Sequence, residues 1–157
     1  MKTTKIIVFL LTLTTLISCK PNDWLDWKTQ NEIWLQENAK KEDVKTTASG
    51  LQYKCIVPGI SQSSGNVDNA KIVRINYSGK LINGYEFDSS EGYENYVNAF
   101  VSGFSEGLKL MKEFGIYELY IPYTLGYGVE GTGSEGAGRH IPPYSTLIFR
   151  VELLDVY

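Results

Sequence analysis

Residues 76–90 have the sequence NYSGKLINGYEFDSS, which predicts two antiparallel strands joined by a tight turn. Asn83 and Gly84 form the turn signal, because both residues tolerate the positive φ that a two-residue hairpin requires. Tyr77 precedes this turn, and Phe87 and Asp88 follow it. No nucleophile with a base, no set of metal ligands and no phosphate-binding loop lies near them in the sequence. The stretch therefore does not predict a hydrolase, a metalloenzyme or a nucleotide-binding protein.

The sequence around this hairpin predicts further strands and one helix. Apolar and polar residues alternate in the way that half-buried strands require, and residues 104–112 have the helical spacing that turns Leu108 and Met111 inward. Residues 126–140 are rich in glycine and predict a long loop. Strands are expected at 51–57, 71–77, 85–87, 116–121 and 146–154. These elements predict an α+β domain in which a curved antiparallel sheet, a half-barrel, wraps on one short helix.

The first 18 residues predict a lipoprotein signal peptide. Two lysines precede an apolar run that is too short to span a membrane, and residues 16–19 have the sequence LISC. This ending resembles a bacterial lipobox, in which Cys19 is lipidated and becomes the new N-terminus. The alternative is an ordinary signal peptide in which Cys19 is incidental. By family analogy, Lys20 in place of aspartate favours an exported protein anchored at the outer membrane, on its periplasmic side or at the cell surface.

Residues 22–43 predict a helix with three tryptophans, and residues 44–49 predict a linker. Together they make up an N-terminal helix and linker at 19–49. Three explanations of the tryptophans stay open: packing on the protein's own domain, pairing with a second copy, or contact with a membrane interface. Cys55 has no second cysteine to pair with once Cys19 is lipidated, and it is expected to be a small buried hydrophobic residue.

The charge of the chain excludes one class of partner. It carries 15 Lys and Arg against 18 Asp and Glu, a net charge of −3, and has no basic stripe. A protein that neutralises phosphates needs clustered positive charge, so no nucleic-acid partner is expected.

Six segments together resemble a known family. They are TTASGLQYK, INYSGKLINGYEFDSS, GFSEGLKLMK, YELYIP, GYG and IPPYSTLIFRVELLDV, and in this order they resemble the FKBP-type peptidyl-prolyl cis-trans isomerases. The resemblance covers residues 50–156 and implies an FKBP-type isomerase domain at 50–157, with the junction before it similar to that of Mip-type bacterial members. It implies no cofactor and no metal. It also implies proline-containing polypeptide substrates, macrolide inhibitors of the family, and a membrane contact only through the lipid anchor.

The resemblance also assigns a pocket. The catalytic residues that it implies are Tyr77, Phe87, Asp88, Tyr127 and Phe149, and the substrate-binding residues are Tyr96, Phe100, Val101, Phe104 and Ile141. Such a set suits this reaction, because rotation about an Xaa-Pro bond must overcome a barrier of about 20 kcal/mol and needs no nucleophile. An apolar pocket disfavours the planar, polar amide more than the twisted one.

Three departures from the family bear on activity. Phe104 stands where the family has tryptophan, the segment between Ser90 and Phe104 is shorter, and the glycine-rich loop is longer. For the aromatic residue of the shortened strand, Tyr96 is the first candidate and Tyr93 the second. An alternative function is therefore a binding module or chaperone that keeps the pocket with little turnover. A third hypothesis is an assembly lipoprotein that uses the tryptophan-rich helix as its partner surface.

Overall fold

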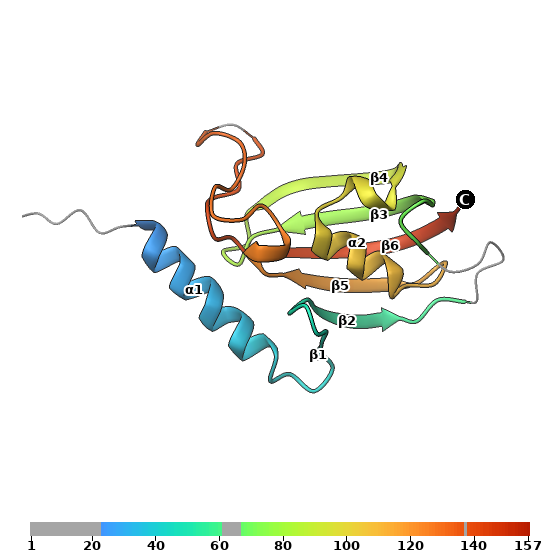
Figure 1. Cartoon of the computed structure of the whole chain (residues 1–157), viewed down its shortest axis with the longest axis horizontal. Helices are drawn as coiled ribbons and strands as arrows, with labels where there is room; N and C mark the ends of the chain where they lie inside the picture. The colour runs from blue at the N-terminus through green and yellow to red at the C-terminus, as the bar shows by residue number, and fades with distance from the viewer. Residues whose placement is uncertain (1–22, 61–66, 137) are drawn as a thin grey trace, which may run out of the picture.

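The computed structural model describes residues 23–60, 67–136 and 138–157. The predicted signal peptide and Cys19 lie outside these residues. The described chain contains one antiparallel sheet, in the order β1-β2-β5-β6-β3-β4, and two α-helices (Figure 1). The strands are β1 Lys45–Thr46, β2 Gln52–Val57, β3 Ile72–Lys80, β4 Glu86–Tyr96, β5 Ile116–Ile121 and β6 Leu147–Val156. The helices are α1 Asp23–Asn38 and α2 Ser102–Lys109, with short 3₁₀ turns η1 Val97–Ala99 and η2 Tyr123–Leu125. The expected α+β architecture is confirmed.

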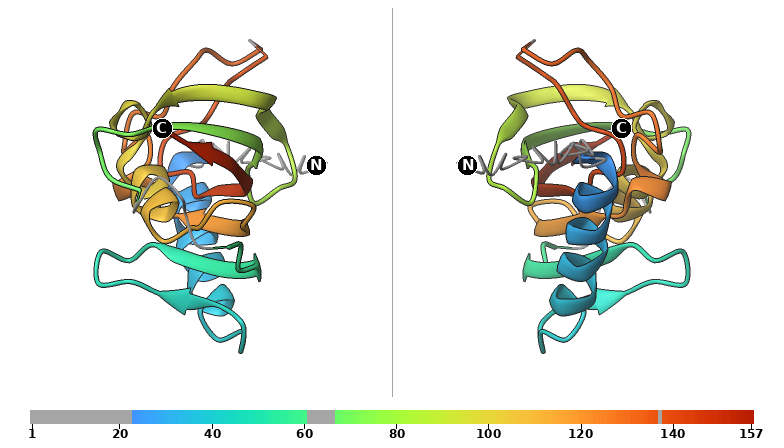
Figure 2. Two further views of the ribbon diagram at one scale, coloured as in Figure 1. Left: turned by 90° about the vertical axis from the view of Figure 1, so that its right-hand side faces the viewer. Right: turned by 90° about the vertical axis from the view of Figure 1, so that its left-hand side faces the viewer.

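The predicted hairpin joins β3 to β4. Gly84 has a φ of 86°, and its N–H donates to the carbonyl of Leu81 at 2.9 Å. The N–H of Tyr85 donates to the side chain of Asn83 at 3.0 Å, which closes the turn. β4 then continues to Tyr96, far beyond the expected end of the strand at residue 87. Figure 2 shows the resulting stack of strands from β4 to β1, seen nearly along their axes.

Helix α2 lies against the inner face of the sheet because two glycines let it come close. A Cβ atom on Gly103 would lie 2.5 Å from Ile121, and one on Gly107 would lie 2.4 Å from Leu119. Glycines four residues apart occupy one face of a helix, so this face can rest on β5. Leu108 is fully buried beneath the helix, as expected. The α-helix ends at residue 109 rather than 112, because the next N–H groups bond to carbonyls three residues back, as in a 3₁₀ turn.

Helix α1 packs on the opposite face of the same strands. Trp34 contacts the ring of Tyr120 at 5.6 Å between centroids, and Tyr120 neighbours the inward-facing Leu119 on β5. Successive side chains of a strand point to opposite faces, so α1 and α2 enclose β5 between them. The indole N–H of Trp27 donates to the hydroxyl of Ser145 at 3.0 Å. Two of the three tryptophans therefore pack on the protein's own domain. Among the described residues, no helix is long and apolar enough to cross a membrane.

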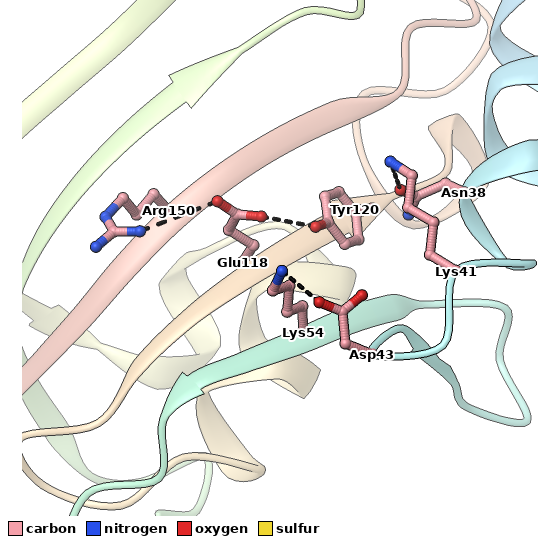
Figure 3. Close-up of polar contacts among 7 residues, drawn as sticks. All are labelled: Asn38, Lys41, Asp43, Lys54, Glu118, Tyr120 and Arg150. Atoms are coloured by element: carbon pink, nitrogen blue, oxygen red, sulfur yellow. Dashed lines mark hydrogen bonds and ion pairs between the residues drawn. The ribbon is translucent and has the colours of Figure 1, made fainter.

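Polar contacts fasten the C-terminal end of α1 and the chain after it to the sheet. Figure 3 shows Lys41 with Asn38 and Lys54 with Asp43. The amide of Asn38 donates to Gln52 on β2 at 2.9 Å, and the ammonium group of Lys41 donates to Asn38. Lys54 pairs with Asp43, which draws the chain after the helix toward β2. Here the structure differs from the expected linker at 44–49, because Lys45–Thr46 forms the edge strand β1. The boundary between segments 19–49 and 50–157 stays a prediction, but these contacts join both parts.

Cys55 is exposed, so the prediction of a buried thiol was wrong. β1 pairs only with Gln52 and Tyr53 of β2. Beyond these two residues the outer edge of β2 has no neighbouring strand among the described residues. The alternation of the sequence placed Cys55 on the correct face of β2, where it pairs with Tyr117 of β5. It could not show that this part of β2 lacks a neighbouring strand on its outer side.

Asn31 gives a test of the packing of α1. This asparagine is fully buried; its side-chain oxygen accepts the N–H of Thr146 at 2.7 Å, and its amide donates to the carbonyl of Trp27 at 2.8 Å. Asn31→Leu would leave a buried N–H without a partner, so we expect the free energy of unfolding to fall by about 1–3 kcal/mol. Urea unfolding followed by circular dichroism measures it. The exposed neighbour serves as control in Gln30→Leu, and equal midpoints for both variants would contradict the packing.

Candidate active site

A pocket of about 280 Å³ opens on the inner face of the sheet, between β3, β4, β6 and the N-terminal end of α2. Aromatic side chains and one carboxylate dominate its lining. The lining residues are Tyr77, Asp88, Tyr93, Asn95, Ala99, Phe100, Val101, Phe104, Tyr127 and Phe149. Seven of the ten residues that the resemblance implied therefore lie in one pocket, and Phe87, Tyr96 and Ile141 do not line it.

The aromatic rings hold one another in place by edge-to-face contacts. Phe149 on β6 meets Phe104 at 4.9 Å and Tyr77 at 6.1 Å between ring centroids. Phe100 stacks on Phe104 at 4.8 Å, and the side chain of Phe104 is almost completely buried. The edge-to-face pairs that Phe149 makes with Phe104 and Tyr77 are favourable because the ring edge is positive and the ring face is negative. The floor of the pocket is thus a closed aromatic layer, although phenylalanine replaces the larger tryptophan of the family.

A β-bulge explains why the side chains of two consecutive residues, Phe87 and Asp88, both lie on the inner side of the sheet. Lys80 pairs with Glu86, and Gly79 pairs with Asp88, so Phe87 is an extra residue on β4. In a regular strand neighbouring side chains point to opposite faces, and a bulge interrupts this alternation. Asp88 therefore lines the pocket, while Phe87 packs behind the wall with its ring 5.4 Å from that of Phe149.

A second irregularity in β4 decides which tyrosine lines the pocket. Tyr77 pairs with Ser90 and Ile75 with Tyr93, so three steps on β4 oppose two steps on β3. Gly92 has a φ of 62°, and its N–H donates to the side chain of Asn76 at 2.8 Å. The extra residue shifts every later side chain to the other face.

The placement of Tyr96 in the site is therefore corrected to Tyr93. The ring of Tyr93 lies 5.9 Å from Tyr77 and 6.2 Å from Phe100. Tyr96 is 52% exposed and pairs with Ile72 near the end of the sheet. The family resemblance named Tyr96 first and Tyr93 second, and the irregularity at Gly92 that decides between them is not visible in the sequence. The same shift brings Asn95 into the lining, a residue that sequence reasoning missed.

Asp88 is held from both sides. The hydroxyl of Tyr77 donates to one carboxylate oxygen at 2.9 Å, and the guanidinium group of Arg139 lies 3.2 Å from the other. Burial and this carboxylate raise the pKa of the Tyr77 hydroxyl well above its usual value. Arg139 belongs to the glycine-rich loop and is 78% exposed, so the ion pair adds little stability and can open. Sequence reasoning missed Arg139, because its partner lies 51 positions away.

Tyr127 and Val101 complete the rim with groups that can hold a peptide. Tyr127 follows η2 and is 40% exposed; burial and the Asp88 carboxylate raise the pKa of its hydroxyl. Val101 has an extended backbone before α2, and its carbonyl accepts the N–H groups of Phe104 and Ser105. Ile141 is buried under the rim, where its backbone exchanges two hydrogen bonds with Thr132. It supports the loop rather than lining the pocket.

Comparison with known proteins identifies the family. The family model described as "FKBP-type peptidyl-prolyl cis-trans isomerase" matches residues 64–154, and the one described as "Domain amino terminal to FKBP-type peptidyl-prolyl isomerase" matches residues 25–55. The FKBP-type 22 kDa peptidyl-prolyl cis-trans isomerase of Escherichia coli is 46% identical over 127 residues, which are 78% of this chain and 58% of the relative.

Two further matches agree. The peptidyl-prolyl cis-trans isomerase Mip of Coxiella burnetii is 38% identical over 81% of this chain and 54% of its own length. The crystal structure of FkpA from Escherichia coli superposes with a TM-score of 0.77 at 36% identity, over 85% of this chain and 61% of that one. The chain thus spans about half the length of the curated relatives that it matches. With its sequence, fold and pocket in agreement, the chain belongs to the FKBP-type peptidyl-prolyl cis-trans isomerases.

Proposed function

We propose that this protein isomerises Xaa-Pro bonds in exported or surface polypeptides. The observation that carries the proposal is the aromatic pocket in which a single carboxylate, Asp88, is held by Tyr77 and Arg139. Its volume of about 280 Å³ can take a proline ring against the aromatic side chains of Tyr77, Phe104 and Phe149. The family membership of the chain agrees with this reaction.

The walls of the pocket act on the amide itself. A planar Xaa-Pro amide has a polar carbonyl that water solvates well, and twisting about the C–N bond reduces this polarity. Transfer into a water-poor aromatic site therefore raises the free energy of the planar form more than that of the twisted form. No proton has to leave or join the substrate in this step.

The polar groups at the rim orient the peptide on both sides of the twisting bond. We assign to the Val101 N–H and the Tyr127 hydroxyl the role of donors to substrate carbonyls. Both residues lie in the lining of the pocket. The tyrosine hydroxyl is protonated at neutral pH, so Tyr127 can donate to a substrate carbonyl. Asp88 fixes the Tyr77 ring that forms one wall.

The second candidate function is a binding module or chaperone that keeps the pocket with little turnover. Its main support is the phenylalanine at position 104 in place of tryptophan, together with the shortened segment between Ser90 and Phe104. Phe104 still packs against Phe100 and Phe149, so the floor of the pocket remains aromatic, and a rate measurement separates turnover from binding alone. A macrolide inhibitor of the family should compete with peptide for the same pocket.

We further propose that Cys19 carries a lipid that anchors the protein at a bacterial membrane, with the outer membrane favoured by Lys20. The motivation is the sequence LISC after a short charged and apolar start. The domain would then work at a membrane surface, on polypeptides that have already been exported.

Phe149→Leu tests the aromatic wall. The smaller, flexible side chain would admit water beside the amide, and a loss of about 2.7 kcal/mol of barrier reduction corresponds to a hundredfold lower kcat/KM. Exchange between cis and trans forms of an Xaa-Pro peptide, measured by NMR, gives the rate for wild type and variant. Phe114→Leu changes an exposed ring that does not line the pocket and should retain full activity. A folded Phe149→Leu protein with wild-type kcat/KM would refute this site, and a wild type that binds without accelerating exchange would favour the binding module.

Cys19→Ser tests the anchor. Because the thiol is the only lipid attachment point that the LISC motif offers, this variant should move from the membrane fraction to the soluble fraction of expressing cells. Mass spectrometry of the wild type should show an N-terminal Cys19 that carries the added acyl groups. Cys55→Ser alters the other thiol and should leave the distribution unchanged. Equal membrane retention of all three proteins would exclude lipidation at Cys19.

A further inference from the structure

An apolar surface lies where the first turn of α1 meets the loop before β6. It surrounds a cavity of about 280 Å³ lined by Trp24, Leu25, Lys28, Val129, Pro143 and Tyr144, and we call these six residues the α1 patch. Trp24 is 41% exposed, Leu25 58% and Val129 51%. In Figure 1 the start of α1 and the loop after β5 lie at the same end of the molecule. Three large apolar side chains therefore gather at one end without being used by the core.

The α1 patch is not explained by the packing of the helix on its own domain. Trp27 and Trp34 already face the sheet, through Ser145 and Tyr120. Trp24 and Leu25 lie outside this contact and expose much of their surface. An exposed group of large apolar residues marks an interaction surface more often than a scattered single residue does.

The proposed lipid anchor determines what covers this surface. Trp24 follows Cys19 by five residues, so the extended chain can reach at most about 17 Å from the lipidated thiol to the patch. The polar interface of a bilayer is itself about 5–8 Å thick on each side. We propose that the α1 patch rests on the lipid surface and orients the isomerase domain there, an inference that rests on the proposed lipidation of Cys19.

The chemistry of the patch suits a membrane interface. Tryptophan and tyrosine concentrate at this depth, because their rings are apolar at one end and polar at the other. The ammonium group of Lys28 lies over the Tyr144 ring at 5.4 Å and also pairs with Glu32 at 3.7 Å. Asp26 and Glu130 are exposed beside the patch. Three carboxylates, of Asp26, Glu32 and Glu130, thus outnumber the single ammonium group of Lys28. The contact should therefore depend on apolar burial rather than on attraction to anionic lipid.

The anchor is what makes so small a patch sufficient. Three side chains bind a bilayer weakly on their own, but a short tether raises their effective concentration at the surface to the millimolar range. Val129 of the patch lies two residues after Tyr127 of the pocket, a separation of at most about 7 Å along the chain. Contact through the patch would consequently hold the rim of the pocket close to the membrane surface.

Quenching of tryptophan emission by brominated lipid tests the contact. The chain from Cys19 onward, which contains every described residue, is coupled through Cys19 to a maleimide lipid in phosphatidylcholine vesicles, with Cys55→Ser to prevent a second attachment. Because the lipid is attached chemically, the quenching experiment does not require natural lipidation. If Cys19 is not lipidated in cells, the mass of the cell-derived protein shows it, and the quenching result is unaffected. We expect Trp24 to be quenched and Trp27 and Trp34, packed on the domain, to serve as internal reference. Raising the salt concentration should not change the result.

Matched variants assign the signal. Trp24→Phe keeps the apolar contact but removes the emitting ring, so the quenched fraction should disappear. Leu25→Gln with Val129→Gln keeps the ring and should reduce quenching at least threefold. Ile33→Gln changes an exposed residue of the same helix about 12 Å further on and should have no effect.

Three outcomes would overturn the proposal. One is an anchored wild type whose emission matches that on unbrominated vesicles, and another is an Ile33→Gln variant as weakly quenched as the double variant. The third is an anchored wild type that is not quenched, combined with Trp24 emission that shifts in solution as the protein concentration rises. This result would assign the α1 patch to contact with a second copy of the chain.

Discussion

The pocket depends on the close approach of two aromatic rings, those of Phe87 and Phe149, over Gly79 of β3. Gly79 of β3 pairs with Phe149 on β6 and with Asp88 on β4. A Cβ atom at this position would lie 2.6 Å from the ring of Phe149 and 2.7 Å from that of Phe87. A side chain at this position would force at least one of the two rings to move, so glycine lets rings from both neighbouring strands meet above β3. The wall of the site is thus built across three strands, with Phe149 as its centre.

The other parts of the site build on this wall. Phe149 contacts Phe104, which α2 carries, and α2 is seated by the glycines that face β5. The wall also contacts Tyr77, whose hydroxyl reaches Asp88. The glycine-rich loop then closes one side through Arg139, by an exposed ion pair that is weak enough to open. An aromatic interior with a weakly held rim suits the proposed isomerisation, in which a polypeptide segment enters and leaves without a covalent bond being broken.

Much of the fold could be predicted because local patterns and packing agree. The alternation of Leu147, Phe149, Val151 and Leu153 marked the buried face of β6, and Asn83 with Gly84 marked the hairpin. The failures come from features that no local pattern reports. The bulge near Gly92 puts Tyr93 rather than Tyr96 in the lining of the pocket, and the bulge at Phe87 places that ring behind the wall. Arg139 pairs with Asp88 only because the loop folds back over the sheet. Cys55 was misplaced because the sequence does not show where a sheet edge loses its neighbour.

Gly79→Ala tests most directly whether catalysis depends on this arrangement of rings. The backbone of Gly79 is not in the left-handed region, so alanine strains no dihedral angle, and its methyl group acts only by displacing Phe87 and Phe149. Gly138→Ala, where no atom lies within 4 Å of the new methyl group, is the matched control. Measured by NMR exchange on an Xaa-Pro peptide, kcat/KM should fall at least about tenfold, or 1.4 kcal/mol, for Gly79→Ala and stay unchanged for the control. A folded Gly79→Ala protein with full activity would contradict the account.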